Sequence, residues 1–441
     1  MNAQVSFLDT TLSLVHIPLP LYSALLQPIL KVLLPDSQSQ SQQPPTNATH
    51  NKHPFINISV TPLECSIVCP TAWARALFAD HHHHHHRHQQ QHQQKEEEGE
   101  EPGSLSLHRT NRAKTDNRGT GTGISISQDT YLALCVTSGS TNAGSRVADL
   151  TSPLARAAIP IFFITTYYAD FILVPTRDRQ AVVQTLLQGG FAFAEDAGQE
   201  TALLVSLAPR GTAGTARTGA GAGAGTGGGA RGERGGGEEL QGRTFELLRR
   251  SGVVPYVEAG LRLVQCSGRE KSAFLVRENR RSARGGGGGG GGRGGAIGAA
   301  GSTAGGGSAA TVCWVDTVDT KLYTSVVSAL VSQPRFLSIT LAQDDPPSLL
   351  MDRELLGMFG DSIVGPTEGA LVPIFLDLAD LPFEATGIVS GVAGRLVKEM
   401  RMGEGAELSY LSTARAGAVI LSYEDSVRAL GVLRPLLIED D

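Results

Sequence analysis

Residues 159–174 read IPIFFITTYYADFILV, and this stretch indicates how the whole chain is organised. Apolar residues flank a short polar segment at 165–170, which is the pattern of two buried strands joined by a turn. A second copy, LSYLSTARAGAVIL, occupies residues 408–421. The two copies are 247 residues apart, so Thr413 is equivalent to Thr166 and Gly417 is equivalent to Asp170. The repeat predicts a chain that is internally duplicated.

The elements around the two hairpins also repeat. A strand predicted at 131–137 precedes a helix at 146–158, the first hairpin, and a helix at 180–187 that ends before Gly189. Similar series of strand, helix, two strands and helix are expected three more times in the chain. This order predicts an α+β fold of four small units with antiparallel sheets.

Biased tracts separate these units. They are rich in Ser, Gln and Pro, in His, Gln and Glu, or in Gly, and they hold too few apolar residues to form a core, so we expect disordered linkers. The expected organisation is a first unit at 1–80 with a disordered insertion at 36–53, a linker at 81–127, a second unit at 128–207, a Gly-rich linker at 208–310 with a semi-structured island at 244–276, a third unit at 311–360 and a fourth at 361–441.

Charge and composition exclude several functions. The formal net charge of -6 over 441 residues argues against a nucleic-acid surface, which needs clustered Lys and Arg. Arg residues among the glycines could touch RNA, although a solubilising linker is the simpler interpretation. We therefore expect no nucleic-acid partner.

The cysteines and the apolar N-terminal region bear on location. Five cysteines without a Cys-x-x-Cys motif favour free core thiols in a reducing, cytoplasmic setting. Six histidines at 81–86 imply no fixed metal geometry. Residues 12–34 are apolar enough to suggest a membrane span, yet three prolines within them favour a strand followed by a helix. We expect no metal, no cofactor and no membrane contact.

Catalytic motifs are not recognisable, because the sequence has no Gly-x-Ser-x-Gly, His-Glu-x-x-His or phosphate loop. Ligand binding needs less, and the loop PFEATGIV at 382–389 suits it. Gly387 lets the backbone approach a ligand, and the helix that follows offers free N–H groups to a carboxylate. Glu384 could hold an ammonium or guanidinium group; the alternative is a capped loop with a surface carboxylate.

These features resemble a known family. The unit order is that of the ACT domain, the ferredoxin-like βαββαβ module that binds amino acids at domain interfaces. The stretches ITTYYADFILVP, SPLARAA, PFEATGIVSGVAGRL and LSTARAGAVIL are similar to those of the CASTOR family, the cytosolic arginine sensors of the TOR pathway. The resemblance covers about residues 5–78, 129–191 and 311–437. It implies tandem ACT-like units in a non-enzymatic protein that binds an amino acid and signals through a protein partner.

The resemblance further implies a ligand held between the second and fourth units. The implied contacts lie at the start of the first hairpin, in the 382–389 loop and in the second hairpin: Pro160, Ile161, Phe383, Glu384, Thr386, Gly387, Ile388, Val389, Thr413, Ala414 and Gly417. In the arginine sensors the position of Pro160 is a serine and that of Gly417 an aspartate. Because the buried carboxylate is missing here, arginine is disfavoured, and a smaller or neutral amino acid, or no ligand, remains open.

In the family, the turn of the first hairpin docks on a GATOR-type complex that regulates the TOR kinase. Tyr167 and Asp170 match that pattern and Tyr168 replaces a glutamine, so these three are the predicted partner-binding residues. Tyrosines packed at a hairpin end are the alternative. A rival function is an ACT-type allosteric regulatory subunit of an amino-acid biosynthetic enzyme such as aspartate kinase. A homodimer is also expected, because edge strands of ACT units often pair between chains.

Overall fold

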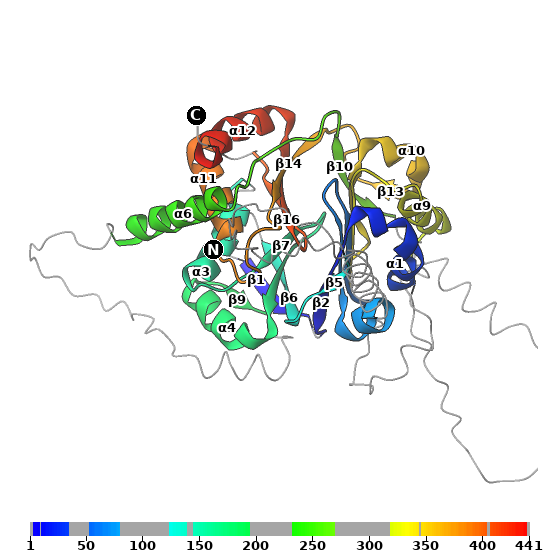
Figure 1. Ribbon diagram of the computed structural model, residues 1–441, viewed down its shortest axis with the longest axis horizontal. Coiled ribbons are helices and arrows are strands. Elements are labelled where there is room, and N and C mark those ends of the chain that lie inside the picture. Colours follow the sequence, from blue (N-terminus) through cyan, green and yellow to red (C-terminus); the bar gives the residue numbers. More distant parts are fainter. Residues whose placement is uncertain are drawn as a thin grey trace, which may run out of the picture.

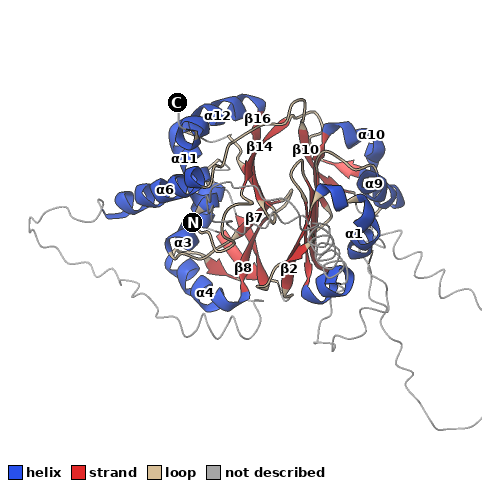
Figure 2. Cartoon of the chain, viewed as in Figure 1, coloured by secondary structure: helices blue, strands red, loops and turns tan. Residues whose placement is uncertain are grey.

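The computed structural model describes residues 3–8, 10–34, 53–79, 123–138, 144–194, 232–269, 318–343, 345–403 and 406–438. Within these ranges the strands lie in the middle of the molecule and the helices cover it on two sides (Figures 1 and 2). Helices α3, α4, α6, α11 and α12 lie on one side, and α1, α9 and α10 on the other (Figure 1). None of the described helices is long and apolar enough to cross a membrane.

The first half of the chain starts with two strands that belong to different parts of the sheet. In order it forms β1 (Ala3–Phe7), β2 (Leu12–Ile17), the 3-10 turns η1 (Leu19–Leu21) and η2 (Ser23–Leu25), α1 (Leu26–Leu33), β3 (His53–Val60), β4 (Cys65–Pro70), a helix over 71–79, β5 (Ser125–Ile126), β6 (Tyr131–Ser138), α3 (Arg146–Arg156), β7 (Phe162–Thr165), β8 (Asp170–Pro175), η4 (Thr176–Asp178), α4 (Arg179–Gln188) and β9 (Ala192–Phe193).

The second half begins with a long helix. In order it forms α6 (Gly232–Arg250), β10 (Leu263–Gly268), α9 (Thr320–Val331), β11 (Leu337–Gln343), β12 (Ser348–Asp352), η5 (Arg353–Leu355), α10 (Leu356–Phe359), η6 (Gly360–Ser362), β13 (Ile363–Val364), β14 (Leu371–Asp377), α11 (Ile388–Met400), β15 (Ser409–Ser412), β16 (Ala416–Ser422) and α12 (Tyr423–Leu437).

The two hairpins form for the same local reasons. β-Branched and aromatic residues fill their strands, and β8 and nearly all of β16 are buried. A threonine closes each turn: the Thr166 hydroxyl donates to the Ala169 carbonyl at 2.7 Å, and the Thr413 hydroxyl donates to the Ala416 carbonyl at 3.2 Å. The corresponding backbone N–H groups also donate to these carbonyls, at 2.9 Å each.

The described strands form one sheet that closes on itself. Twelve strands make a ring in the order β2-β4-β3-β11-β12-β10-β14-β16-β15-β7-β8-β6, and a pairing of β6 with β2 completes it. The ring consists of four groups of three strands, (β2, β4, β3), (β6, β8, β7), (β10, β12, β11) and (β14, β16, β15). In each group the third strand in chain order lies between the other two.

The groups meet at four joints of unequal strength. The β3–β11 joint has six paired positions. The joints β7–β15, β10–β14 and β2–β6 have one paired position each, Leu411 with Ile164, Leu263 with Leu371, and Leu12 with Tyr131. Three of the four joints therefore rest on very few backbone hydrogen bonds.

Three apolar cores stabilise this arrangement. One fills the inside of the ring and includes Phe55, Phe171, Phe336 and Phe375. Two others lie between the outer face of the ring and its helices, one under α3, α4, α6, α11 and α12 and one under α1 and α9. Because the ring strands face a core on both sides, most of their residues are apolar, and the buried polar side chains of Asn57 and Ser59 on β3 bond to Ser338 and Thr340 on β11.

The predicted α+β fold with an antiparallel sheet is confirmed, although the closed ring is not anticipated by the sequence. Residues 244–276, expected to be an island within a linker, supply part of α6 and all of β10, which pairs with β12, β13 and β14. The first seven residues of the expected third unit, 311–317, lie outside the described residues, and so do most of the expected linkers. The proposed domain boundaries stay a prediction.

Candidate ligand-binding site

A cavity of 180 Å³ lies beside the β7–β15 joint. It is enclosed by residues that precede β7, by the loop between β14 and α11, and by the turn of the second hairpin. Its lining is mostly apolar: Ile161, Phe162, Leu378, Ala379, Leu381, Pro382, Phe383, Ala385, Gly387, Ile388, Val389, Tyr410, Ser412, Thr413, Ala414, Arg415 and Ala416.

Seven of the eleven predicted ligand contacts come together in this lining, namely Ile161, Phe383, Gly387, Ile388, Val389, Thr413 and Ala414. Glu384 instead lines a neighbouring cavity of 510 Å³ that also contains His16 and Arg415. Pro160 and Thr386 are outside the lining, and Gly417 lies within β16, where it pairs with Leu376 and Ser412. Whether these residues bind a ligand stays a prediction.

At the β7–β15 joint, side-chain hydroxyl groups accept hydrogen bonds from backbone N–H groups that would otherwise bond to backbone carbonyls of the other strand. On either side of the Ile164–Leu411 pair, the Phe163 N–H donates to the Ser412 hydroxyl oxygen at 2.9 Å, and the Tyr410 N–H donates to the Thr165 hydroxyl oxygen at 3.0 Å. The two bonds are equivalent under the 247-residue repeat. The cavity lies on the side of this joint where 161–162 face 412–414.

The N-terminus of α11 forms one wall of the cavity. Gly387 has φ 81°, a left-handed conformation that favours glycine, and no side chain caps the helix. The carbonyl of Gly387 accepts from the Thr244 hydroxyl at 3.3 Å, so α6 supports the turn. Gly387, Ile388 and Val389 all line the cavity. Free N–H groups and the helix dipole make this wall suitable for a carboxylate.

Tyr410 contributes a buried hydroxyl to the site. Its side chain is 1% exposed, and its Oη atom has no hydrogen-bond partner among the described residues. Burial raises the pKa of Tyr410, so the hydroxyl stays protonated. A Cβ atom at position 417 would collide with this hydroxyl, and it would lie 3.1 Å from Tyr410 Cζ. Gly417, where the arginine sensors have an aspartate, therefore leaves room for the tyrosine.

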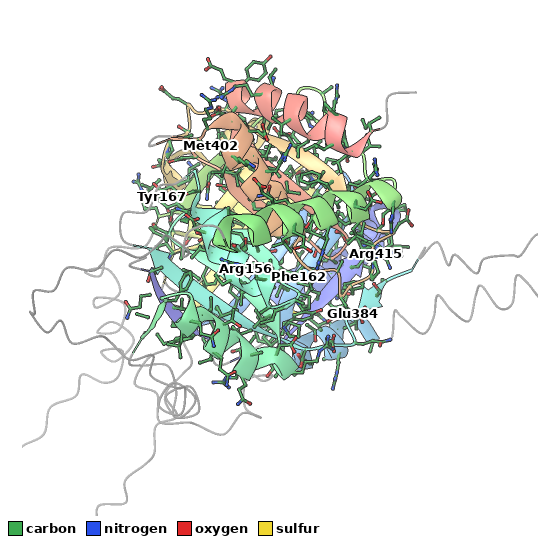
Figure 3. All side chains as sticks on the ribbon, turned by 90° about the vertical axis from the view of Figure 1, so that its left-hand side faces the viewer. Arg156, Phe162, Tyr167, Glu384, Met402 and Arg415 are labelled. Carbon is green, nitrogen blue, oxygen red and sulfur yellow. The ribbon has the colours of Figure 1, made fainter. Side chains whose placement is uncertain are left out.

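Arg415 is the one charged residue in the described lining of the cavity. Its Nε atom is buried without a partner among the described residues. Arg415 also lines the 510 Å³ cavity that contains Glu384, and Figure 3 shows Arg415 and Glu384 on the same side of the molecule. The cavity thus presents hydrogen-bond donors and one cation, and no side-chain carboxylate.

A buried carboxylate outside the cavity lining, that of Glu64, anchors the second hairpin turn. Glu64 is 1% exposed, and its Oε1 atom accepts from the Thr413 hydroxyl at 2.5 Å and from the Arg415 N–H at 2.7 Å. Its Oε2 atom lies 2.5 Å from Nδ1 of His16. The Ala414 N–H donates to the Ser66 hydroxyl at 3.0 Å. Since Glu64 does not line the cavity, it positions the turn and leaves the ligand space free.

The turn of the first hairpin is anchored differently. The Tyr167 N–H donates to the Ser348 hydroxyl at 2.8 Å, and the Tyr168 hydroxyl donates to that of Ser267 at 2.7 Å. Tyr168 is 47% exposed, and its role in binding a partner stays a prediction. Figure 3 shows Tyr167 and Arg415, from the two turns, near opposite edges of the molecule.

Asp170, also predicted to bind a partner, is only 2% exposed and lies 2.6 Å from Arg146 Nε. Burial raises the pKa of Asp170 to about 6, although Arg146 opposes the shift. The carboxylate faces a cavity of 540 Å³ on the other side of the β7–β15 joint. Its observed role is therefore to pair with Arg146 inside the protein.

Sequence reasoning missed Tyr410, Glu64 and His16. For Tyr410 a signal existed, because the first hairpin has Phe163 and Asp170 where the second has Tyr410 and Gly417. For Glu64 and His16 no pattern was available, since their contact joins β2 to the residue before β4. In the described ranges, no three His, Cys, Asp or Glu side chains gather at a distance that suits a metal ion.

Comparison with known proteins identifies one family. Residues 126–188, from just before β6 to the end of α4, match the ACT domain. The ACT domain is a regulatory and non-catalytic domain, and ACT domains generally bind amino acids and dimerise. No curated protein matches the chain. The matched region, residues 126–188, is therefore similar to an ACT domain and includes the first hairpin.

Two solved structures show a weak likeness. A structural-genomics target from Agobacterium tumefaciens is 14% identical, with 44% of this chain and 93% of that chain covered, at a TM-score of 0.24. Aspartate kinase from Synechocystis is 10% identical, with 100% of this chain and 56% of that chain covered, at a TM-score of 0.27. The chain thus spans little more than half of the kinase. At these TM-scores neither structure bears on fold or function.

Proposed function

We propose that this chain is a non-catalytic cytoplasmic sensor that binds an amino acid in the 180 Å³ cavity and signals through a protein partner, as the CASTOR-like proteins it resembles do in the TOR pathway. The observation that carries the proposal is the joining of three separate segments, 161–162, 378–389 and 410–416, around one cavity next to an ACT domain.

The strand order supports an extension of the ACT assignment to the whole ring. The second group, (β6, β8, β7), lies within the ACT match, and the other three groups have the same internal order. We propose that each group is the sheet of one ACT-like unit, with α1, α3, α9 and α11 as the first helix of each. The cavity would then lie between the second and fourth units.

The chemistry of the cavity supports an amino acid. An α-carboxylate would accept from the N–H groups at the start of α11, and the apolar residues Ile161, Phe162 and Leu381 would exclude water around the bound molecule. A volume of 180 Å³ equals about six waters at ~30 Å³ each, which suits a small molecule of this kind.

A thermal-shift screen of the twenty amino acids at millimolar concentration tests the proposal. A ligand at 100 times its dissociation constant should raise the free energy of unfolding by about 2.7 kcal/mol. Ala385→Trp, which fills the cavity from a partly exposed position, should abolish the shift, and Ala385→Ser should keep it. If no amino acid stabilises the wild-type chain, the sensor proposal fails.

The partner is tested separately by affinity capture. Recovery of a TOR regulator of the GATOR type supports the sensor, whereas recovery of an amino-acid biosynthetic enzyme supports the rival function as an allosteric regulatory subunit. Tyr168→Ala removes the most exposed aromatic of the first turn and should reduce capture. If the Tyr168→Ala variant captures the partner as well as the wild-type chain does, the partner does not dock on the first hairpin turn.

A further inference from the structure

We infer that the ligand of the 180 Å³ cavity carries a second negative charge, on its side chain, so that the acidic amino acids aspartate and glutamate are the class it takes. The inference rests on the proposed function and adds the identity of the side chain. It follows from the groups that face the cavity and from one group that has no partner.

The first observation is the unpaired hydroxyl of Tyr410. A buried hydroxyl without a hydrogen bond costs stability, and native proteins rarely retain one without a reason. Tyr410 lines the cavity but its Oη atom has almost no accessible surface, so a ligand atom would supply the missing partner after a small movement of the tyrosine side chain. The helix end and the tyrosine belong to different walls, so they can contact two ends of one molecule.

The second observation is the sign of the charge. Arg415 is the charged lining residue, its Nε atom is buried without a partner, and no carboxylate lines the described cavity. Among the end groups of ligand side chains, a carboxylate suits a guanidinium group best, because the guanidinium offers a matching fork of N–H donors. A ligand with a basic side chain would meet this cation without a compensating acid.

The acidic residues near the cavity do not line it, and these include Asp377 and Asp380 in the 377–389 segment. Glu64 lies behind the turn, and both of its oxygens have partners, Thr413 and the Arg415 N–H on one side and His16 on the other. Glu384 lines the neighbouring cavity, across the wall that Phe383, Ala414 and Arg415 form. Neither carboxylate is positioned to hold the side chain of a ligand in the first cavity.

The third observation is the internal repeat. Gly417 has no Cβ atom, which makes space for the Tyr410 hydroxyl, whereas the first hairpin has Phe163 and Asp170 at the equivalent positions. The second hairpin therefore has a donor hydroxyl on Tyr410, which lines the cavity, and lacks the carboxylate acceptor of the first hairpin. A ligand that fits beside Tyr410 must therefore present an acceptor.

The test is isothermal titration of the full chain with L-glutamate, L-aspartate, L-glutamine and L-arginine, together with three variants. Wild type should bind an acidic amino acid, the amide more weakly, and arginine not at all. Tyr410→Phe should weaken binding of the acidic ligand by about 10-fold to 100-fold, as expected for a lost hydrogen bond to a charged group. Arg415→Met should remove the preference for acid over amide.

Two controls separate a binding effect from a folding effect. Tyr410→Phe should leave the ligand-free thermal midpoint unchanged or higher, because it removes a hydroxyl that has no partner. Arg353→Met changes an exposed arginine away from the cavity and should leave binding unchanged.

The outcomes distinguish the inference from the function. If the wild-type chain binds an acidic amino acid and Tyr410→Phe and Arg415→Met both weaken that binding, the inference and the proposed function are both supported. Binding of a neutral or basic amino acid in preference to the acidic ones overturns the inference and keeps the sensor function. Wild-type affinity for the acidic ligand in Tyr410→Phe overturns the role of the hydroxyl. No binding of any amino acid overturns the proposed function and the inference with it.

Discussion

The two hairpins share a framework and differ in their buried polar groups. Thr165 pairs with Asp170 in the first as Ser412 pairs with Gly417 in the second, and both turns are closed by a threonine. The first hairpin has an acid that Arg146 neutralises inside the protein. The second has a tyrosine hydroxyl that nothing in the described chain satisfies. This difference supports the proposal that the second copy, which has the buried tyrosine hydroxyl, is the one that binds a ligand.

The two turns also differ in how they are fastened to the neighbouring strands. Neutral serine hydroxyls hold the first turn, through Ser348 and Ser267. A buried carboxylate holds the second, and it brings His16, Thr413 and the Arg415 N–H together. Loss of either anchor should therefore have consequences of different size.

The largest effect is expected for Glu64→Ala. The change leaves three buried donors around one missing carboxylate, which should lower the free energy of unfolding by about 3–5 kcal/mol. Ser348→Ala, the matched change at the first turn, removes one neutral acceptor and should cost about 1 kcal/mol. Urea unfolding of both variants measures the difference, and equal losses would show that the two anchors are equivalent.

The next effect is a pH dependence that belongs to the first hairpin alone. Burial raises the pKa of Asp170 from 3.8 to about 6, so the folded state holds this proton more tightly than the unfolded chain. Stability from this group is therefore highest below pH 4 and falls as pH rises to 6, by about 3 kcal/mol at 1.36 kcal/mol per pKa unit.

Asp170→Asn should remove this pH term. The free energy of unfolding of wild type minus that of the variant should fall between pH 4 and pH 6 and stay constant above it. Chemical denaturation at several pH values gives this difference, in which the other titrating groups cancel. A difference that does not change with pH would mean that Arg146 compensates the burial of the carboxylate fully.

The smallest effect should come from making the second hairpin resemble the first. Gly417→Asp brings a side chain onto the Tyr410 hydroxyl and should cost about 1–3 kcal/mol through overpacking. Adding Tyr410→Phe removes the closest contact, the one with the hydroxyl, and restores the Phe and Asp combination of the first hairpin, while Cζ stays 3.1 Å from the new Cβ atom. The double variant should regain part of the stability and should be stabilised by arginine, which wild type is not. Thermal midpoints with and without arginine, with glutamate as control, decide this.

Much of the hairpin region could be predicted from the sequence because its signals are local. Alternating apolar residues and a polar turn predict β7 and β8, and the repeat carries the prediction to β15 and β16. The loop at 382–389 joins a strand to a helix as expected. Tyr410 could have been found by comparing the two copies position by position.

The remaining features depend on contacts between distant segments. β10 is a six-residue strand between tracts of low apolar content, and only its pairing with β12 and β14 identifies its place. The contact between His16 and Glu64 joins β2 to the residue before its neighbour β4, and no periodic pattern in the sequence predicts it. The ring closes through a single paired position, Leu12 with Tyr131, and no sequence pattern predicts this pairing.

The unequal joints of the ring determine where the protein can open. Local opening needs the least free energy where the fewest backbone bonds break, so the joints with one pair are the compliant parts of the ring and β3–β11 is the stiff one. The candidate cavity lies at one of the compliant joints. A molecule bound there adds bonds between two groups of strands that hold each other weakly, and so it changes how readily those groups separate.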